Sequence, residues 1–146
     1  MRFTRYTDFS MRVLMYLGLR KEGDLSTIKE IAERYGISEN HLMKVVHQLG
    51  RNGYVATVRG RQGGMKLAMA PGEINLGDVV RHCEDDMRLV ECFDAKTNTC
   101  PIADVCALPP VFDEALEAFL SVLDKYSLAD ALGPKQALAA ILSPPA

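Results

Sequence analysis

Apolar residues recur at helical spacing along the first part of the chain, and this pattern predicts three short helices. The first ends near Leu19 and is based on five apolar positions: Tyr6, Phe9, Val13, Leu14 and Leu17. The second begins with a capping box, in which Thr27 is the N-cap and Glu30 lies three residues later. The third follows Ser38 and carries apolar residues at i, i+3, i+4 and i+7, namely Leu42, Val45, Val46 and Leu49. The brief turn at Gly36 makes the second and third helices a helix-turn-helix.

The pattern changes after Gly53 from helical spacing to alternation. The segments YVATV and MKLAM alternate like strands, and RGRQGG between them supplies glycines that permit a tight turn. A helix-turn-helix followed by a basic β-hairpin is typical of a winged helix. We therefore predict a mainly α fold with a small β-hairpin wing.

Helical spacing returns after Pro71. Asn75 is predicted to cap a fourth helix, which carries Cys83 on its apolar face as a small core residue. Pro109 and Pro110 are suited to the first turn of a long fifth helix. The apolar residues of this helix form a heptad-like seam: Phe112, Leu116, Phe119 and Leu123. One small domain cannot easily cover this surface, so we predict a dimerisation helix, with docking on the winged helix as the alternative.

These elements divide the 146 residues into three predicted parts. Residues 1–72 form a winged-helix DNA-binding domain, and residues 73–108 form a linker helix and a loop with three cysteines. Residues 109–146 form the dimerisation helix and a tail. The tail, from SLADAL to SPPA, predicts a short helix and a loosely packed end.

The composition is that of an ordinary globular protein, with 48% hydrophobic and 25% charged residues. The apolar run from Val13 to Leu19 lies between Arg12 and Arg20 and lacks a small-residue cleavage site, so we do not expect a signal peptide. No apolar stretch approaches the roughly 20 residues of a membrane helix. We therefore expect a cytoplasmic protein without membrane partners, in which thiols are reduced.

Charge is unevenly distributed, although the net charge is only −2. From Asn40 to Gly72 there is no acidic residue, but there are five basic ones: Lys44, Arg51, Arg59, Arg61 and Lys66. From Glu73 onward, 13 acidic residues stand against five basic ones. A basic segment on an acidic body is typical of a nucleic-acid footprint, and an ordinary solvated basic loop is the alternative.

The outer face of the third helix is polar or basic. A recognition helix places its N-terminal residues at base edges in the major groove, so Asn40, His41 and Lys44 are the leading candidates for base contact. The wing is expected along phosphates or in the minor groove, where Arg is favoured. The predicted contacts with double-stranded operator DNA are Ser38, Asn40, His41, Lys44, His47, Gln48, Arg51, Arg59, Arg61 and Gln62. For any single residue the alternative is a merely solvated surface.

Three cysteines, Cys92, Cys100 and Cys106, lie in one proline-containing stretch with the spacing C-x7-C-x5-C. Zinc sites usually contain close C-x2-C or C-x4-C pairs, and neither occurs here. Loosely spaced thiolates on a flexible loop suit an iron–sulfur cluster, whose irons need ligands from several directions. The spacing favours a cluster and leaves zinc, a thiol redox switch or no function open.

Four motifs occur in order along the chain: RYTDFSMRVLMYL, ISENHLMKVVHQLGRNGYVATVRGRQGG, INLGDVVR and the three-cysteine loop. Together they resemble the Rrf-two family of bacterial winged-helix transcription regulators, and within it the nitric-oxide-sensing repressors. The resemblance implies a homodimer with one iron–sulfur cluster per subunit, 4Fe–4S being favoured over 2Fe–2S. It also implies that the three cysteines and a carboxylate of the partner subunit hold the cluster. The matching residue is Asp8, which position alone would assign to stabilising the first helical turn.

The resemblance implies a repressor that binds a pseudo-palindromic operator and releases it when nitric oxide reacts with the cluster. An iron-responsive or cluster-status regulator is the alternative, because ECF…CP…C also resembles iron-responsive members of the family, although those lack an equivalent of Asp8. The interval FDAKTNT is also longer than in the enterobacterial pattern of the nitric-oxide-sensing branch. A zinc-binding or cluster-free winged-helix protein is a weaker alternative. We do not expect an enzyme, because the sequence has no C-x-x-C motif, nucleophile–base arrangement or glycine-rich phosphate loop.

Overall fold

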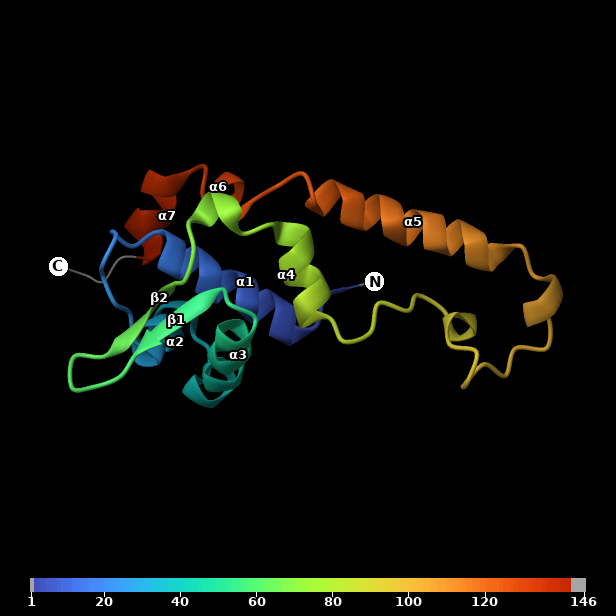
Figure 1. The fold of residues 1–146 in the computed structure, drawn as a ribbon, viewed down its shortest axis with the longest axis horizontal. Helices are drawn as coiled ribbons and strands as arrows, with labels where there is room; N and C mark the ends of the chain where they lie inside the picture. Colours follow the sequence, from blue (N-terminus) through green and yellow to red (C-terminus); the bar gives the residue numbers. More distant parts are fainter. Residues whose placement is uncertain (1, 143–146) are drawn as a thin grey trace.

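The computed structural model describes residues 2–142, whose elements follow the predicted order (Figure 1). The head begins with α1 (Arg5–Gly18), α2 (Ile28–Tyr35), α3 (Glu39–Arg51), β1 (Val55–Val58) and β2 (Gly64–Leu67). The head ends with α4 (Leu76–Cys83), so it comprises residues 2–83. It is followed by α5 (Leu108–Leu123), α6 (Leu128–Ala131) and α7 (Lys135–Leu142). Short 3₁₀ helices lie in the connections, at Pro71–Glu73, Glu91–Phe93 and Ala103–Val105. No helix within residues 2–142 has both the length and the apolar character needed to cross a membrane.

The helices α2 and α3 both begin at a hydroxyl N-cap. Thr27 Oγ1 accepts the N–H of Glu30 at 3.2 Å, and the Glu30 carboxylate accepts the N–H of Thr27 at 2.7 Å, which confirms the predicted capping box. Ser38 Oγ accepts the N–H of His41 at 3.3 Å, so the predicted cap of α3 is also confirmed. Between the two helices, Gly36 has a φ of +62°, a left-handed conformation that glycine adopts without strain.

The wing is an antiparallel hairpin of β1 and β2, with Val55 opposite Leu67 at its base. The second strand is shorter than predicted. The alternating pattern of MKLAM predicted a strand as far as Met69, whereas β2 ends at Leu67. Ser26 extends the sheet by one bridge, exchanging two backbone hydrogen bonds with Met65 at 2.8 and 2.9 Å. The prediction of a mainly α fold with a small hairpin wing is confirmed.

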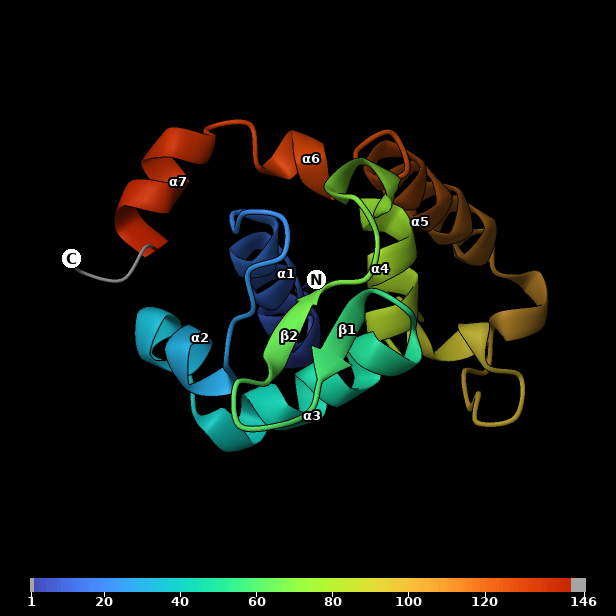
Figure 2. The same cartoon turned by 60° about the vertical axis from the view of Figure 1, so that its left-hand side comes forward.

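The core of the head surrounds α1, which lies in the middle of the head in both views (Figures 1 and 2). Val13 and Leu14 are fully buried, and α1 contacts α3, α4, α6 and β2. Other elements contribute further fully buried side chains: Ile31, Leu42, Leu49, Ile74, Val79 and Leu128. Cys83 is 3% exposed in this core, which confirms its assignment as a small core residue.

Residues 84–107 and α5 form an arm that projects from the head (Figure 1). The chain leaves the end of α4, runs away from the core through two short 3₁₀ helices and returns as α5. α5 contacts α4 near the head, and none of its residues is fully buried. The predicted dimerisation helix is therefore largely exposed in the single chain.

The C-terminal tail packs on the head, on the side of α1 away from α3 (Figure 2). Leu128 is fully buried, and Leu132 and Leu142 are only 6% and 8% exposed. The prediction of one short helix with a loose end is therefore wrong as far as Leu142, because apolar side chains of α6 and α7 complete the core. The last four residues, 143–146, lie outside the described residues. The boundaries proposed after residues 72 and 108 stay predictions.

Candidate DNA-binding surface and cysteine loop

α3 has one buried face and one exposed face. Its apolar residues, Leu42, Val45, Val46 and Leu49, are at most 5% exposed. Residues three and four apart share a helix face, so the opposite side of α3 projects into solvent. The exposed predicted contacts on this helix are Asn40, His41, Lys44, His47 and Arg51. The only carboxylate on α3 is Glu39 in the first turn, so the exposed face is polar and basic apart from Met43.

Two of the predicted contacts on α3 are partly engaged within the chain. The ring of His41 lies 6.3 Å from the ring of Phe9, and Gln48 is half-buried. The side chains of Asn40 and Lys44 are exposed and make no hydrogen bond within residues 2–142. These two are therefore the side chains of α3 best placed to meet base edges.

The wing carries the other predicted contacts. Arg59, Arg61 and Gln62 are all exposed at its turn. In the described part of the chain neither arginine takes part in an ion pair, so both guanidinium groups can meet a phosphate or a narrow minor groove. The wing and α3 lie on the side of the head away from α6 and α7 (Figures 1 and 2).

The three cysteines of the predicted ligand set lie along the loop of the arm. Cys92 is in the 3₁₀ helix Glu91–Phe93, Cys100 lies between the two 3₁₀ helices, and Cys106 precedes α5. All three are half-buried and none forms a disulfide. Cys106 Sγ accepts the N–H of Leu108, the first residue of α5, at 3.5 Å.

The fourth cysteine, Cys83, belongs to a different environment. It is buried at the end of α4, inside the head. Burial raises the pKa of its thiol, which keeps the sulfur protonated and unsuited to metal binding. Cys83 is therefore excluded from the candidate ligand set.

Asp8 lies in the first turn of α1, on the head and not on the arm. Its carboxylate accepts hydrogen bonds from Arg12 Nε and Nη2 at 3.1 and 2.8 Å. The Asp8 side chain is 47% exposed, so a second chain can reach it. The structure thus brings the three cysteines onto one loop and leaves Asp8 apart from them.

The three thiols and the Asp8 carboxylate suit an iron–sulfur cluster by their chemistry. The single chain does not bring these four ligands together. Within residues 2–142, no three His, Cys, Asp or Glu side chains come close enough to hold a metal ion. Three unbridged thiols on a solvent-accessible loop, with an accessible carboxylate on another surface, are ligands that such a cluster accepts. A complete set would need a second chain or a rearranged loop.

α5 has two apolar stripes. The predicted dimerisation residues are half-buried against the chain itself: Phe112, Leu116, Phe119 and Leu123. The ring of Phe119, for example, lies 5.9 Å from the ring of Phe3. A neighbouring stripe at the same helical spacing is exposed: Leu108, Val111, Ala115, Ala118 and Val122. The assignment of the first stripe to dimerisation stays a prediction.

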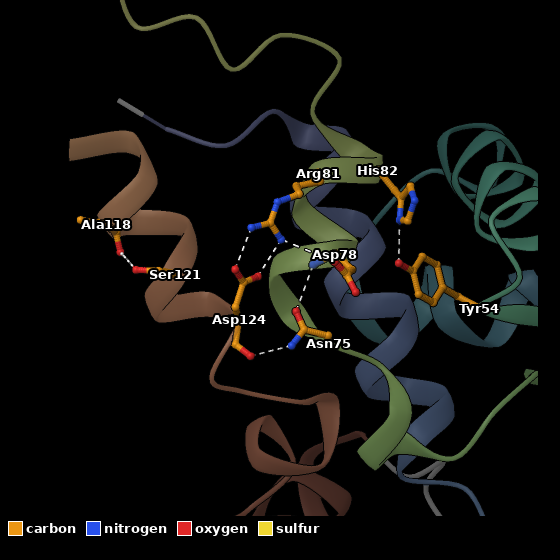
Figure 3. Close-up of polar contacts among 8 residues, drawn as sticks. All are labelled: Tyr54, Asn75, Asp78, Arg81, His82, Ala118, Ser121 and Asp124. Carbon is orange, nitrogen blue, oxygen red and sulfur yellow. Dashed lines mark hydrogen bonds and ion pairs between the residues drawn. The ribbon is translucent and has the colours of Figure 1, made fainter. Parts of the chain in front are cut away.

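α4 connects the arm to the wing. Arg81 donates two hydrogen bonds to the carboxylate of Asp124, just beyond the end of α5, at 2.6 and 2.7 Å (Figure 3). His82 points the other way, and its Nδ1 lies 2.7 Å from the hydroxyl of Tyr54 at the base of the wing. Burial raises the pKa of Tyr54 to about 12, so this group is a neutral phenol. Polar contacts therefore lead from α5 through α4 to the wing.

Some of these residues were not predicted from the sequence. Arg81 and Asp124 are 43 positions apart, and no local pattern indicates that they pair. The exposed stripe of α5 did have a signal in the sequence, because its residues also recur at helical spacing, but they are smaller than the phenylalanines of the predicted stripe. Met43 was also not predicted as a contact, although it is 50% exposed on α3 and lies close in helical position to the predicted base contacts.

The fold combines a helix-turn-helix, whose second helix exposes polar and basic side chains, with a basic β-hairpin wing. These features define a winged-helix DNA-binding protein, and this one also has an arm that carries three thiols. The model of the Rrf2 (Rrf-two) family, described as iron-dependent transcriptional regulator, matches residues 3–134. The chain belongs to this family. The expectation of a transcription regulator, and not an enzyme, is confirmed by this membership.

Curated relatives match the chain almost from end to end. The HTH-type transcriptional regulator NsrR of Bacillus subtilis (strain 168) is 54% identical over 142 residues, which are 97% of this chain and 97% of the relative. The protein of the same name from Halalkalibacterium halodurans is 49% identical over 142 residues, with the same coverage of both chains. The resemblance to the NsrR branch is therefore confirmed.

Solved structures share the fold. T. potens IscR superposes with a TM-score of 0.72 at 26% identity, covering 90% of this chain and 86% of that one. CymR, the global cysteine regulator of B. subtilis, superposes with a TM-score of 0.69 at 22% identity, covering 90% and 95%. At such identity the likeness to CymR shows a common architecture and nothing more.

Proposed function

We propose that this chain is a transcriptional repressor that binds operator DNA as a homodimer and senses nitric oxide through an iron–sulfur cluster. The observation that carries the proposal is the set of three unbridged, half-buried cysteines on the arm of a winged-helix regulator 54% identical to an NsrR. The protein would act in the cytoplasm, where such thiols stay reduced.

DNA would be read by the head. The exposed face of α3 would enter the major groove, with Asn40 and Lys44 at base edges. Arg59 and Arg61 of the wing would hold phosphates or the adjacent minor groove. Contacts of this kind release counterions, so the affinity for the operator should fall steeply as salt rises.

The cluster would be held by Cys92, Cys100 and Cys106, with Asp8 of the partner subunit as the fourth ligand. Three thiolates and a carboxylate permit either cluster type, and the resemblance favours 4Fe–4S. When bound, the cluster supplies iron with which nitric oxide can react. A carboxylate is a harder ligand than a thiolate and binds such iron more weakly. In each chain Arg12 donates hydrogen bonds of 2.8 and 3.1 Å to Asp8, and these would compete with iron for the carboxylate.

The homodimer is supported by the exposed stripe of α5. Leu108, Val111 and Val122 are each at least half exposed, and Ala115 and Ala118 lie between them. Small residues allow a second helix to approach closely, and a row of exposed apolar residues marks an interaction site. A second copy of the chain, related by a two-fold axis, would cover both stripes at once.

The proposal can be tested on protein purified without oxygen. We expect iron and sulfide in comparable amounts, and tight binding in a gel-shift assay to DNA fragments that the cluster-loaded protein selects from a random pool. Nitric oxide should bleach the visible absorbance and weaken this binding. Bleaching that left the DNA affinity unchanged would contradict the sensing role.

Asp8→Ala tests the ligand from the second chain. We expect the variant to lose iron and sulfide faster than the wild type, because one of four ligands is absent. Asp24→Ala, which removes an exposed carboxylate from the loop after α1, is the control and should behave as the wild type. Equal iron retention in both variants would remove Asp8 from the ligand set and leave the role of the cysteines standing.

A second candidate function is iron sensing, which the description of the family as iron-dependent favours. The same cysteines would then report whether a cluster is present, without a reaction with nitric oxide. Iron starvation in cells that receive no nitric oxide separates the two functions. Relief of repression by starvation alone would favour iron sensing.

A further inference from the structure

The interval between Cys92 and Cys100 folds back on itself. The backbone carbonyl of Asp94 accepts the N–H groups of Thr97 and Asn98 at 3.2 and 3.0 Å. A backbone segment that closes its own hydrogen bonds in this way is a compact turn. The seven residues of the interval therefore form a turn, and their number does not measure the distance between the two thiols.

Glu91 closes the base of this turn. One of its carboxylate oxygens accepts both the backbone N–H of Thr99, at 2.5 Å, and the Thr99 hydroxyl, at 2.7 Å. Glu91 directly precedes Cys92, and Thr99 directly precedes Cys100. Hydrogen bonds to a carboxylate are stronger than those between neutral groups. This Glu91–Thr99 clasp therefore joins the two backbone segments that carry the first two thiols.

A second tie holds the turn to the segment that leaves α4. Arg88 donates from Nε and Nη2 to the carboxylate of Asp86, both at 2.7 Å. Its Nη1 also donates to the carboxylate of Asp94, inside the turn. The turn is thus braced at its base by Glu91 and along its side by Arg88.

We propose that Glu91 and Thr99 are positioning residues, which hold Cys92 and Cys100 as a preformed pair of ligands before the remaining ligands bind. This inference rests on the proposed function, because it assumes an iron–sulfur cluster on the loop. Ordering a flexible loop costs conformational entropy, so a loop that is ordered beforehand binds its ligand more tightly.

Lys96 provides a readout that is independent of any metal. It is exposed in the turn, and trypsin can cut after it only when the turn opens locally. In the cluster-free, full-length chain, Glu91→Ala should raise the rate of cleavage after Lys96 about three- to tenfold, the effect of losing roughly one net hydrogen bond. Glu91→Gln keeps an acceptor oxygen and should give an intermediate rate.

Asp104→Ala is the matched control. Asp104 is an exposed carboxylate on the same loop, and its side chain makes no hydrogen bond among the described residues. Its replacement should leave the cleavage rate after Lys96 unchanged. The unfolding temperature should stay the same in every variant, since these residues lie outside the core of the head. Equal cleavage rates in Glu91→Ala and the wild type, or in Glu91→Gln and Glu91→Ala, would overturn the clasp.

The second readout is the rate at which cluster-loaded protein releases iron to a chelator without oxygen. Release should be fastest from Glu91→Ala, slower from Glu91→Gln and slowest from the wild type and Asp104→Ala. Faster cleavage of Glu91→Ala with unchanged iron release would overturn the positioning role, because the clasp would then order the loop without helping the ligands. A wild type that retains neither iron nor sulfide would instead refute the proposed function, and this is seen before any variant is compared.

Discussion

Individual side chains on the DNA-facing surface differ in what they can recognise. Asn40 can pair with adenine through two hydrogen bonds, and Lys44 can reach guanine, so both can contribute sequence preference. Arg59 and Arg61 lie on an exposed turn with glycine neighbours, where charge matters more than fixed geometry. We therefore propose that α3 would read the bases and that the wing would supply salt-dependent affinity.

Arg61→Ala tests this division. Loss of one phosphate contact should weaken binding to all DNA sequences by a similar factor and reduce the slope of log affinity against log salt by about one unit. Fluorescence anisotropy with labelled operator at several salt concentrations measures both effects. Lys135→Ala removes an exposed charge from α7, a helix on the side of α1 away from α3, and should change neither. A variant with weaker binding but an unchanged slope would show that Arg61 does not contact phosphate.

At the scale of secondary-structure elements, several hydrogen bonds hold the junction of α4 and α5 together (Figure 3). Asn75 caps α4 by accepting the N–H of Asp78 at 3.1 Å, and its amide donates to the backbone carbonyl of Asp124 at 2.7 Å. The carboxylate of Asp124 lies directly over Gly77, where any Cβ would collide with it. These contacts fix the direction in which α5 leaves the head, and hence the position of anything that α5 binds.

Acid should weaken this junction. Hydrogen bonds from Arg81 lower the pKa of Asp124 below its usual range. A carboxyl group with a lowered pKa stabilises the fold above its unfolded pKa, about 3.9 for Asp, and this contribution is lost as pH falls through the folded pKa. Asp124→Asn should therefore have a lower unfolding temperature than the wild type at pH 7, and the difference should shrink below about pH 4.

Differential scanning calorimetry from pH 7 to pH 3 measures this difference. Asp113→Asn is a suitable control, because Asp113 is exposed on α5, which Asp124 follows directly, and its side chain has no hydrogen bond within residues 2–142. It should unfold as the wild type does at each pH. If the wild type and Asp124→Asn differed by the same amount throughout, the charge on Asp124 would not be what stabilises the junction.

At the scale of the whole molecule, the head and the arm carry separate features. The head contains the core and the surface that we propose binds DNA, whereas the arm contains the cysteines and the exposed stripe of α5. Two heads joined through their arms would present two recognition helices, and successive half-sites on one DNA face are about 34 Å apart. A change in the cysteine loop could then alter operator binding by changing the distance between the heads.

Val111→Glu should separate the subunits. A charge in the centre of an apolar contact is costly to bury, so the variant should sediment as a monomer at concentrations where the wild type is a dimer. Its operator affinity should fall about a hundredfold, because only one half-site is then engaged at a time. Glu114→Ala changes a polar position of the same helix and should leave the dimer intact. A wild type that sediments as a monomer would refute the dimer.

Much of the fold and part of the site could be predicted from local sequence. The capping box of Thr27 and Glu30, the cap at Ser38 and the burial of Val13 and Leu42 depend on residues within about four positions of one another. The basic surface of α3 and the wing follows in the same way, since each side chain is placed by its own helix or strand. The sequence by itself therefore determined the helices other than α7, the wing and the polar and basic side chains that they expose.

Only the tertiary structure decided what distant segments do together. It packed Leu128 and Leu142 into the core, paired Arg81 with Asp124, and left Asp8 on the head, apart from the cysteines. Such contacts depend on how whole elements pack, and periodicity carries no information about which partner an exposed or apolar face will meet. The closing of the Glu91–Thr99 clasp has the same origin, because an irregular loop has no repeating pattern from which its hydrogen bonds can be deduced.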